Sequence, residues 1–417
     1  MKIYKGNIVY SESINKLVGI TDGYIIVDDN GIIQDVLNEL PIEYKNHEVV
    51  DFKNDLIIPA FSDLHVHAPQ YPNRGIAMDA LLKDWLENYT FPLESRFSNE
   101  EFAREVYTKF VDDLIKYGTL HACVFATIHK DASDILVNLL EEKGIQSYVG
   151  KVNMDQNSPE ELLETTEESV ANTELFIKKH INNKYAKPII TPRFAPTCSF
   201  ELLTKLGELS NKYKVGMQTH IEESIWERDE ALKTLPGSKF DLDIYDKAGL
   251  LEQKPIICAH FIFPQPGDID LAIRKDAFIV QCPDATTNVI AGIMNTSMHV
   301  MNNMNMGYGS DISAGSYLGI YRQVASSIRL SKIKAFYDHP IAWPITFTQA
   351  FYIATKGSGR VFDKVGSLEK GYYFDALVIS GLKDSFYRLT PAELAERFCY
   401  SGDVSNISHR FLRGKEI

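Results

Sequence analysis

Short apolar runs alternate with longer charged segments along the central part of this chain, from Ala60 to Ser313. Segments such as Asn99–Tyr117 and Ser199–Lys212 carry apolar residues at helical spacing, so we expect amphipathic helices between the strands. Strands that alternate with helices predict βα units, and eight such units predict an α/β fold of the (β/α)8 TIM-barrel type. The expected strands are Ile57–His67, Leu120–Thr127, Ser147–Asp155, Pro188–Pro196, Val215–Ile221, Pro255–Phe263, Phe278–Pro283 and Met304–Asp311.

The two ends of the chain differ from this pattern. Runs of β type, broken by Gly, Asn and Asp turns, occupy the first part of the chain, and similar runs return at Gly371–Ile379 and Val404–Leu412. Strand segments that flank a barrel at both ends predict one small β-sandwich domain built from both termini. We therefore expect one part of the sandwich at residues 1–58, the barrel at residues 59–357 and the other part of the sandwich at residues 358–417.

Composition excludes several classes of function. The 417 residues are 45% hydrophobic and 24% charged, as in an ordinary globular protein. A net charge of −13, with dispersed Lys and Arg, argues against nucleic acid or an anionic membrane as a partner. We find neither a signal peptide nor about 18 consecutive apolar residues, so we expect a cytoplasmic protein. The five cysteines include no Cys-x-x-Cys pair, which predicts reduced thiols and excludes the Cys/His zinc site of cytidine deaminases.

Histidines and an aspartate recur at the ends of the expected strands. His65 and His67 end the first strand, where side chains two residues apart leave the same face, and His220, His260 and Asp311 end later ones. Taken singly, each is also explained as a buried hydrogen-bonded histidine or a helix-capping aspartate. Together they predict a metal site, and nitrogen and oxygen ligands without thiolate fit zinc or iron. The histidines of expected helices and loops should lie in solvent: His47, His180, His299, His339 and His409.

Glu223 lies three residues beyond His220, in the loop that leaves the fifth expected strand. A metal site with an open coordination position binds water and lowers its pKa toward neutrality. A carboxylate that is not a ligand can then move protons between that water and a leaving group, which is the role predicted for Glu223. Its neighbour Glu222 is expected to be a solvated carboxylate at the start of a helix.

Several longer segments resemble a known family. The run Pro59-Ala60-Phe61-Ser62-Asp63-Leu64-His65-Val66-His67 is similar to the first-strand motif of the amidohydrolase superfamily. Further segments resemble guanine deaminases and together span nearly the whole barrel: His67–Tyr71, Trp85–Pro92, Phe125–His129, Val149–Asp155, Glu164–Ser169 and Thr191–Phe194.

This resemblance implies one divalent metal ion per chain, with zinc as the first choice and iron as the second. It implies metal ligands at His65, His67, His220 and Asp311, catalytic roles for Glu223, His260 and Asp311, and base contacts from Gln70, Arg193, Phe194 and Glu223. In this scheme Glu223 moves protons, while His260 and Asp311 hold the reacting water. Members of the superfamily with two metal ions carry a modified lysine on the fourth strand, and the run Pro188–Pro196 contains none.

The reaction implied by the resemblance is the hydrolysis of guanine by water to xanthine and ammonia, a step of purine catabolism and salvage. The resemblance also implies a homodimer. Two alternatives stay open from the sequence. One is an amidohydrolase that deaminates a different purine, a pteridine or a triazine. The other is a catalytically dead barrel with an assembly role, which is disfavoured because every ligand position is kept.

Overall fold

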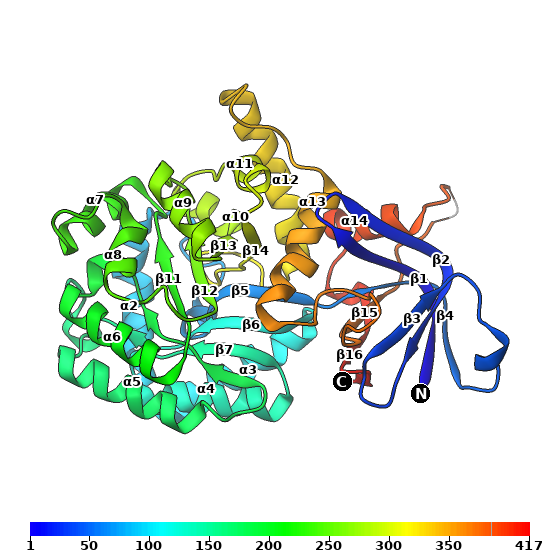
Figure 1. Cartoon of the computed structure of the whole chain (residues 1–417), viewed down its shortest axis with the longest axis horizontal. Helices are drawn as coiled ribbons and strands as arrows, with labels where there is room; N and C mark the ends of the chain where they lie inside the picture. The colour runs from blue at the N-terminus through cyan, green and yellow to red at the C-terminus, as the bar shows by residue number, and fades with distance from the viewer. Residues whose placement is uncertain (385) are drawn as a thin grey trace.

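The computed structural model describes residues 1–384 and 386–417 as a barrel of strands and helices beside a sheet (Figure 1). Each of the eight predicted barrel strands is present, and two of them are divided into two short pieces. In chain order they are β5 (Phe61–His67), β6 (Thr119–Phe125), β7 (Gln146–Gly150) with β8 (Val152–Asn153), β9 (Ala186–Pro188) with β10 (Thr191–Pro192), β11 (Met217–Ile221), β12 (Ile256–His260), β13 (Phe278–Gln281) and β14 (Asn305–Tyr308).

Parallel pairing carries the strands around the barrel. Strands β5, β6, β7 and β9 pair in that order, as do β11, β12, β13 and β14. Ile190 pairs with Met217 and so joins the two halves, while the backbone N–H of Asp311 donates to the carbonyl oxygen of His65 at 2.8 Å and closes the circle. The predicted (β/α)8 barrel is therefore confirmed.

Helices surround the barrel, and their starts carry the expected capping residues (Figure 1). The Asn99 side chain accepts from the backbone at the start of α3, and Thr165 with Glu168 forms a capping box at the start of α5. In chain order the helices are α1 (Leu82–Trp85), α2 (Phe91–Glu94), α3 (Glu100–Lys116), α4 (Lys130–Lys143), α5 (Thr166–His180), α6 (Phe200–Tyr213), α7 (Ile225–Thr234), α8 (Asp241–Lys247), α9 (Pro266–Arg274), α10 (Pro283–Asn288), α11 (Thr296–Met301), α12 (Ile320–Tyr337), α13 (Phe347–Tyr352) and α14 (Pro391–Ser401).

The second domain is a seven-stranded sheet to which both termini contribute, as predicted. Its strands follow the order β17-β16-β15-β4-β1-β2-β3, and β4 joins the two ends of the chain because it pairs with both β1 and β15. The strands are β1 (Lys2–Ser13), β2 (Lys16–Val27), β3 (Ile33–Leu37), β4 (Val49–Pro59), β15 (Ala376–Ile379), β16 (Ile407–Leu412) and β17 (Lys415–Glu416). The domain limits at residues 58 and 358 stay predictions.

Two expected strands differ from the structure at their N-terminal ends. The single strand predicted for Ile57–His67 is two strands, because β4 ends in the terminal sheet at Pro59 and β5 begins in the barrel at Phe61. The fourth barrel strand begins at Ala186 and so includes Lys187, a residue outside the expected run Pro188–Pro196. Lys187 is exposed and lies near the N-terminal end of the fourth barrel strand, away from the C-terminal strand ends.

Buried histidines contradict part of the expectation for helices and loops. His180 on α5 is 2% exposed and its Nε2 lies 2.7 Å from Asp134 Oδ1, while His299 on α11 is wholly buried. The prediction of solvated side chains is therefore wrong for these two histidines. All five cysteines are buried and free of disulfides. No helix among residues 1–384 and 386–417 is long and apolar enough to cross a membrane.

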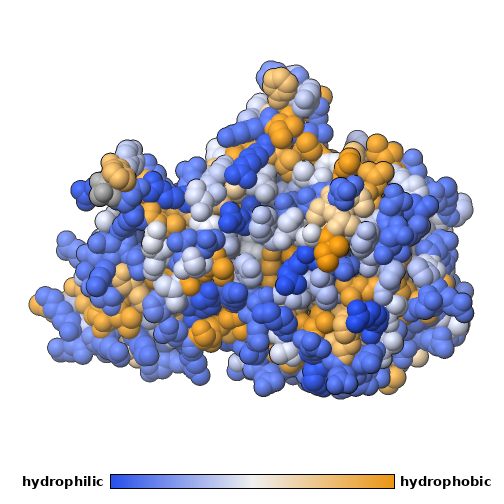
Figure 2. All heavy atoms as spheres, turned by 180° about the vertical axis from the view of Figure 1, so that it is seen from behind, coloured by the Kyte–Doolittle hydropathy of each residue, from blue (hydrophilic) through white to orange (hydrophobic). Residues whose placement is uncertain are grey.

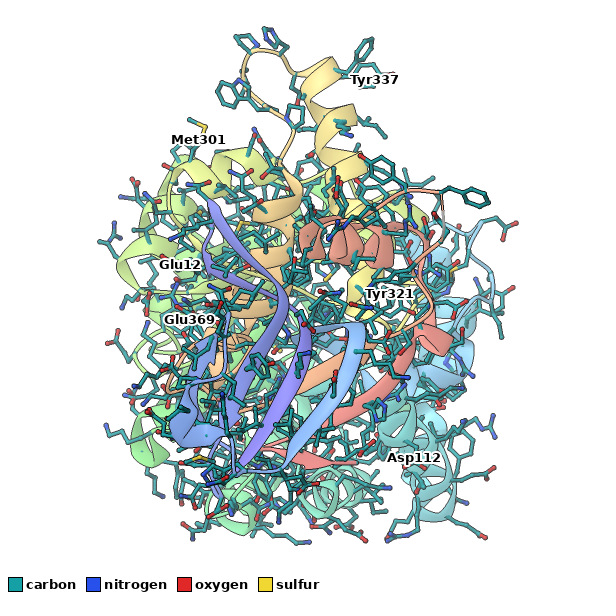
Figure 3. The ribbon with its side chains drawn as sticks, turned by 90° about the vertical axis from the view of Figure 1, so that its right-hand side faces the viewer. Glu12, Asp112, Met301, Tyr321, Tyr337 and Glu369 are labelled. Atoms are coloured by element: carbon teal, nitrogen blue, oxygen red, sulfur yellow. The ribbon has the colours of Figure 1, made fainter. Side chains whose placement is uncertain are left out.

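The end of α12 projects from the body of the molecule, and Tyr337 lies at its tip (Figures 1 and 3). Apolar side chains gather on this projection, above a surface that is mostly hydrophilic (Figure 2). The large side chains Phe336, Tyr337 and Ile341 are 81%, 76% and 71% exposed.

A buried polar contact joins the barrel to the terminal sheet. His121 on β6 places Nε2 2.9 Å from Asp375 Oδ2 and Nδ1 3.2 Å from the Ser62 hydroxyl, and both His121 and Asp375 are at most 1% exposed. The backbone N–H of Arg413 donates to the other oxygen of Asp375. Residues from four separate parts of the sequence therefore form hydrogen bonds with one another at the junction of the two domains.

We expect Asp375→Ala to lower the free energy of unfolding by about 3 kcal/mol or more, because His121 and the Arg413 amide would stay buried without an acceptor. Denaturant unfolding of the purified protein measures this loss. The matched control is Asp384→Ala, since the pair of Asp384 with Arg397 is partly exposed and exposed pairs contribute little. Equal stability of the two variants would contradict a structural role for the buried contact.

Candidate active site

A cavity opens at the C-terminal ends of the barrel strands, where the sequence places its candidate residues. Eight of these residues lie in its wall, while His65 lies beneath it, fully buried. The wall is formed by His67, Gln70, Leu82, Trp85, Leu86, Arg193, Phe194, His220, Glu223, Trp226, Glu227, His260, Asp311 and Ala314. Strands β5, β11 and β12 and the segments that follow β10 and β14 therefore bring the predicted residues to one place.

Three histidines and an aspartate converge on one point. Asp311 Oδ1 lies 3.3 Å from His65 Nε2 and 3.5 Å from His67 Nε2, and the Nε2 atoms of His67 and His220 are 2.9 Å apart. Ligands of a tetrahedral zinc ion at about 2.05 Å are roughly 3.3 Å from one another. These three spacings are close to that value, so the cluster has the dimensions of a site for one metal ion of zinc size.

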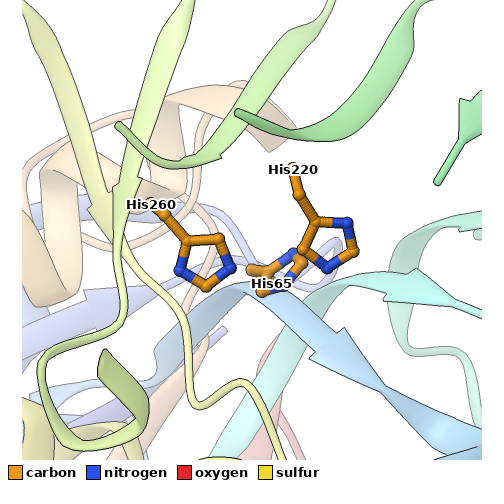
Figure 4. A group of neighbouring side chains, drawn as sticks. All are labelled: His65, His220 and His260. Atoms are coloured by element: carbon orange, nitrogen blue, oxygen red, sulfur yellow. The ribbon is translucent and has the colours of Figure 1, made fainter. Parts of the chain in front are cut away.

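Burial favours the neutral form of the imidazoles in this cluster. Burial, with Arg193 as a second cause, lowers the pKa of His65 to about 3, and burial lowers the pKa of His67, His220 and His260 well below the usual value. Neither ring nitrogen of His65 has a hydrogen-bond partner among the described residues. Buried nitrogens without a partner are costly, and a metal ion would satisfy them. Figure 4 shows His65, His220 and His260 facing one another.

Hydrogen bonds that involve the backbone orient two of these candidate ligands. His220 Nδ1 lies 2.6 Å from the carbonyl oxygen of Arg193, which leaves Nε2 free to face the other ligands. The Asp63 carboxylate, itself fully buried, accepts from the backbone N–H of His65 at 3.1 Å and of Ser310 at 3.0 Å. Asp63 thereby ties the strand that carries His65 to the loop that carries Asp311.

Strained backbone accompanies the site. His260 and Asp311 have φ angles of 77° and 49°, in the left-handed region that most side chains avoid. Glu222 and Phe261, beside His220 and His260, have φ angles of 50° and 52°. Such residues persist only where the surroundings fix them, and they concentrate at functional sites. The barrel therefore tolerates local strain at the positions where the candidate ligands leave their strands.

Glu223 and His260 lie on the open side of the cluster. Glu223 Oε2 is 3.7 Å from His260 Nε2, which in turn is 4.0 Å from Asp311 Oδ2. Burial, followed by the charges of Asp311 and Glu227, raises the pKa of the Glu223 carboxyl well above its usual value. The backbone N–H of Glu223 donates to Glu227 Oε2 at 2.8 Å, which fixes the start of the loop. A carboxyl with a raised pKa, next to the cluster, can both hold and release a proton.

Glu222 differs from expectation. Its side chain is fully buried and does not line the cavity, and burial, with nearby Asp268 as the next cause, raises the pKa of its carboxyl to about 11. The prediction of a solvated carboxylate is wrong, because the tertiary structure buries the Glu222 carboxyl beside other carboxyls, those of Asp268, Asp241 and Glu227. Only the tertiary structure separates these two adjacent glutamates.

The other side of the cavity carries Gln70, Arg193 and Phe194. Arg193 Nη1 and Nη2 donate to the Glu94 carboxylate at 2.6 and 3.2 Å, and Gln70 Nε2 donates to the same carboxylate at 2.9 Å. The Phe194 ring is partly exposed and its centroid lies 6.4 Å from that of His220. Glu94 was not among the predicted residues. Its signal in the sequence is a carboxylate two residues beyond the segment Trp85–Pro92, which resembles the family.

Comparison with known proteins agrees with this geometry. The model of the Amidohydrolase family matches residues 56–417. A guanine deaminase of Dictyostelium discoideum is 33% identical over 443 residues, covering 100% of this chain and 98% of that protein. A guanine deaminase of Homo sapiens is 32% identical over 442 residues, covering 100% of this chain and 96% of that protein.

A solved structure extends the comparison to three dimensions. The guanine deaminase from C. acetobutylicum, with guanine bound in its active site, has a TM-score of 0.96 and 42% sequence identity to this chain. The match covers 100% of this chain and 99% of that one. With the family model matched over most of its length and full-length relatives above 30% identity, the chain belongs to the amidohydrolase family.

Proposed function

We propose that this protein is a guanine deaminase, which uses water to convert guanine to xanthine and ammonia in purine catabolism and salvage. The observation that carries the proposal is that one cavity holds both the His/Asp cluster and the polar pair Gln70 and Arg193. The similarity to guanine deaminases over the full length of the chain supports the same substrate. A deaminase needs these two features together, because the base must be held with one carbon at the reacting centre.

The amidohydrolase family is metal-dependent. His65, His67 and Asp311 form one group of close ligand atoms and His65, His220 and His260 form another, and for this cluster we propose one zinc ion. Such an ion, when bound, lowers the pKa of a water molecule toward neutrality. In our proposal His65, His67, His220 and Asp311 hold it. Asp311 also presents Oδ2 toward His260, so these two side chains would orient the attacking water.

We propose that Glu223 moves the protons of the reaction. It would take a proton from the attacking water and give it to N3 of guanine. It would then take the proton of the new C2 hydroxyl and give it to the amine, which leaves as ammonia while C2 becomes a carbonyl carbon. Its place beside His260 and the raised pKa of its carboxyl support this role. Gln70 and Arg193 would hold the edge of the base by hydrogen bonds, and Phe194 would contact its face. Groups fixed in advance around developing charge provide much of the rate enhancement in enzymes.

We also propose a homodimer. The projection at the end of α12 exposes Phe336, Tyr337 and Ile341, and large exposed apolar side chains of this kind usually mark a protein contact. This part of the proposal concerns assembly and is independent of the chemistry at the site.

Metal removal provides the first test. Elemental analysis of the purified protein should give about one equivalent of divalent metal per chain, since one group of four ligands surrounds one point. Dialysis against a chelator should abolish ammonia release from guanine, and added zinc should restore it. Two equivalents that are both needed for activity, or full activity of the metal-free protein, would contradict the single-ion site.

Replacement of Glu223 tests the proton transfer. Glu223→Gln should keep the metal and lower turnover on the order of 10²–10⁴-fold, the usual contribution of a general acid–base group. The matched control is Glu222→Gln. This change replaces the adjacent carboxyl, which lies outside the cavity wall and whose pKa burial raises to about 11. The control should stay within a few-fold of the natural chain. Near-normal turnover by Glu223→Gln would move the role elsewhere, with Glu227 as the next carboxyl in the cavity wall.

A panel of bases tests the substrate. Guanine should be preferred over adenine by roughly 10⁴-fold or more in kcat/KM, because adenine offers no O6 and carries its amine at another carbon. Pterins and triazines in the same ammonia-release assay cover the other deaminases of the superfamily. Comparable turnover of adenine and guanine would overturn the substrate but leave the deaminase chemistry standing.

Arg193→Ala tests the contribution of the base-holding side. Loss of guanine turnover should come with loss of stability of about 3 kcal/mol or more, because Glu94 would stay buried without its charged partner. Turnover must therefore be expressed per folded molecule, with the folded fraction taken from circular dichroism. Undiminished activity per folded molecule would exclude Arg193 from the base-binding site.

A further inference from the structure

Glu94 is the buried residue that connects the two polar side chains of the base-holding wall. It is 3% exposed and does not line the cavity, whereas Gln70 and Arg193 do. Its Oε1 accepts from Gln70 Nε2 at 2.9 Å and from Arg193 Nη2 at 3.2 Å, and its Oε2 accepts from Arg193 Nη1 at 2.6 Å. One carboxylate behind the wall therefore holds both side chains in front of it.

The charge of Glu94 decides which way the Gln70 amide faces. An ionised carboxylate only accepts hydrogen bonds, so the NH2 group of Gln70 must be the part that faces Glu94. The Gln70 carbonyl oxygen then faces away from Glu94. Among residues 1–384 and 386–417, none donates a hydrogen bond to this oxygen, and it is not enclosed. Gln70 therefore offers the cavity a free acceptor.

Arg193 is fixed from two sides by the same short helix. Glu94, the last residue of α2, binds the edge of the guanidinium in a bidentate pair, and the ring of Phe91, the first residue of α2, lies with its centroid 5.2 Å from the guanidinium carbon. Bidentate pairs and contact with an aromatic face both restrict the orientation of arginine. The N–H groups of Arg193 that Glu94 leaves free are therefore presented in a fixed direction beside the acceptor of Gln70.

We propose that Glu94 is a positioning residue that makes this wall selective for a lactam edge, a ring N–H beside a carbonyl oxygen. Gln70 would accept from the ring N–H and Arg193 would donate to the carbonyl oxygen. In guanine these groups are N1–H and O6, and N1 is bonded to C2, the carbon that loses its amine. This inference deepens the proposed function and rests on it for the identity of the base. The preference itself follows from the donor and acceptor pattern that Glu94 imposes.

Two bases that cannot be deaminated test this preference by binding alone. Hypoxanthine keeps O6 and N1–H but has no amine at C2, whereas purine lacks both O6 and N1–H. The natural protein should bind hypoxanthine at least about tenfold more tightly than purine, the usual effect of a hydrogen bond to a charged group. Isothermal titration calorimetry of the metal-loaded protein with each base measures the ratio of the two dissociation constants.

Glu94→Gln should reduce this ratio to about threefold or less. A neutral amide can donate to Gln70 as well as accept, so the Gln70 amide is free to turn, and Arg193 loses its charged partner. If Glu94 had only a structural role, its replacement would lower the folded fraction and weaken the binding of both bases equally. The ratio of the two dissociation constants would then stay unchanged. If Glu94→Gln does not fold, Glu94→Asp serves instead, because it keeps the charge but withdraws the carboxylate from both partners. The ratio should again fall to about threefold or less.

The matched control is Asp134→Asn, because Asp134 is another buried carboxylate with several partners, His180, Lys130 and Lys179, on the outer helix α4. It should lose stability and keep the tenfold ratio. An unchanged ratio in the Glu94 variants, or no preference for hypoxanthine in the natural protein, would overturn the proposal. Ammonia release from guanine is measured in a separate assay. If the natural protein releases no ammonia but still prefers hypoxanthine, the proposed deaminase activity is rejected, while the proposed role of Glu94 stands.

Discussion

The closure of the barrel between its first and last strands is the constraint on which the site depends. Asp63 accepts from the backbone of His65 and of Ser310, and the Asp311 amide donates to the His65 carbonyl at 2.8 Å. The same hydrogen bonds that close the circle of strands set the distance between His65 and Asp311. The position of the candidate metal site is therefore a consequence of barrel closure, because its first and last ligands lie on either side of the seam.

Burial gives the cluster its chemical character. Imidazoles removed from water stay neutral, and the pKa of His65 falls to about 3, while the carboxyls of Glu223 and Asp311 shift in the opposite direction. Each shift reflects a charged form made unfavourable by the surrounding apolar protein. A cation at the centre would reverse the effect on Asp311, since the charge of an ion dominates its neighbourhood. Such an arrangement costs stability locally, and the large core of the barrel offsets this cost.

Arg193 connects the two halves of the cavity. Its carbonyl oxygen orients His220 on the ligand side, and its guanidinium pairs with Glu94 on the base-holding side. A displacement of Arg193 would therefore move a candidate ligand and the base-holding wall together. The two functions proposed for the cavity, holding a metal ion and holding a base, therefore share a single residue at the end of one strand.

The sequence by itself determined the barrel, the shared sheet of the two termini and the placement of histidines at strand ends, because strand and helix periodicity are local patterns and parallel strands end at one face. Only the tertiary structure decided the break at Ala60, the burial of Glu222, His180 and His299, and the role of Glu94 behind the cavity wall. Burial and the choice of a partner depend on residues far away in the chain: Glu94 meets Arg193 across 99 positions. A local pattern contains no information about such a meeting, which arises when the barrel closes.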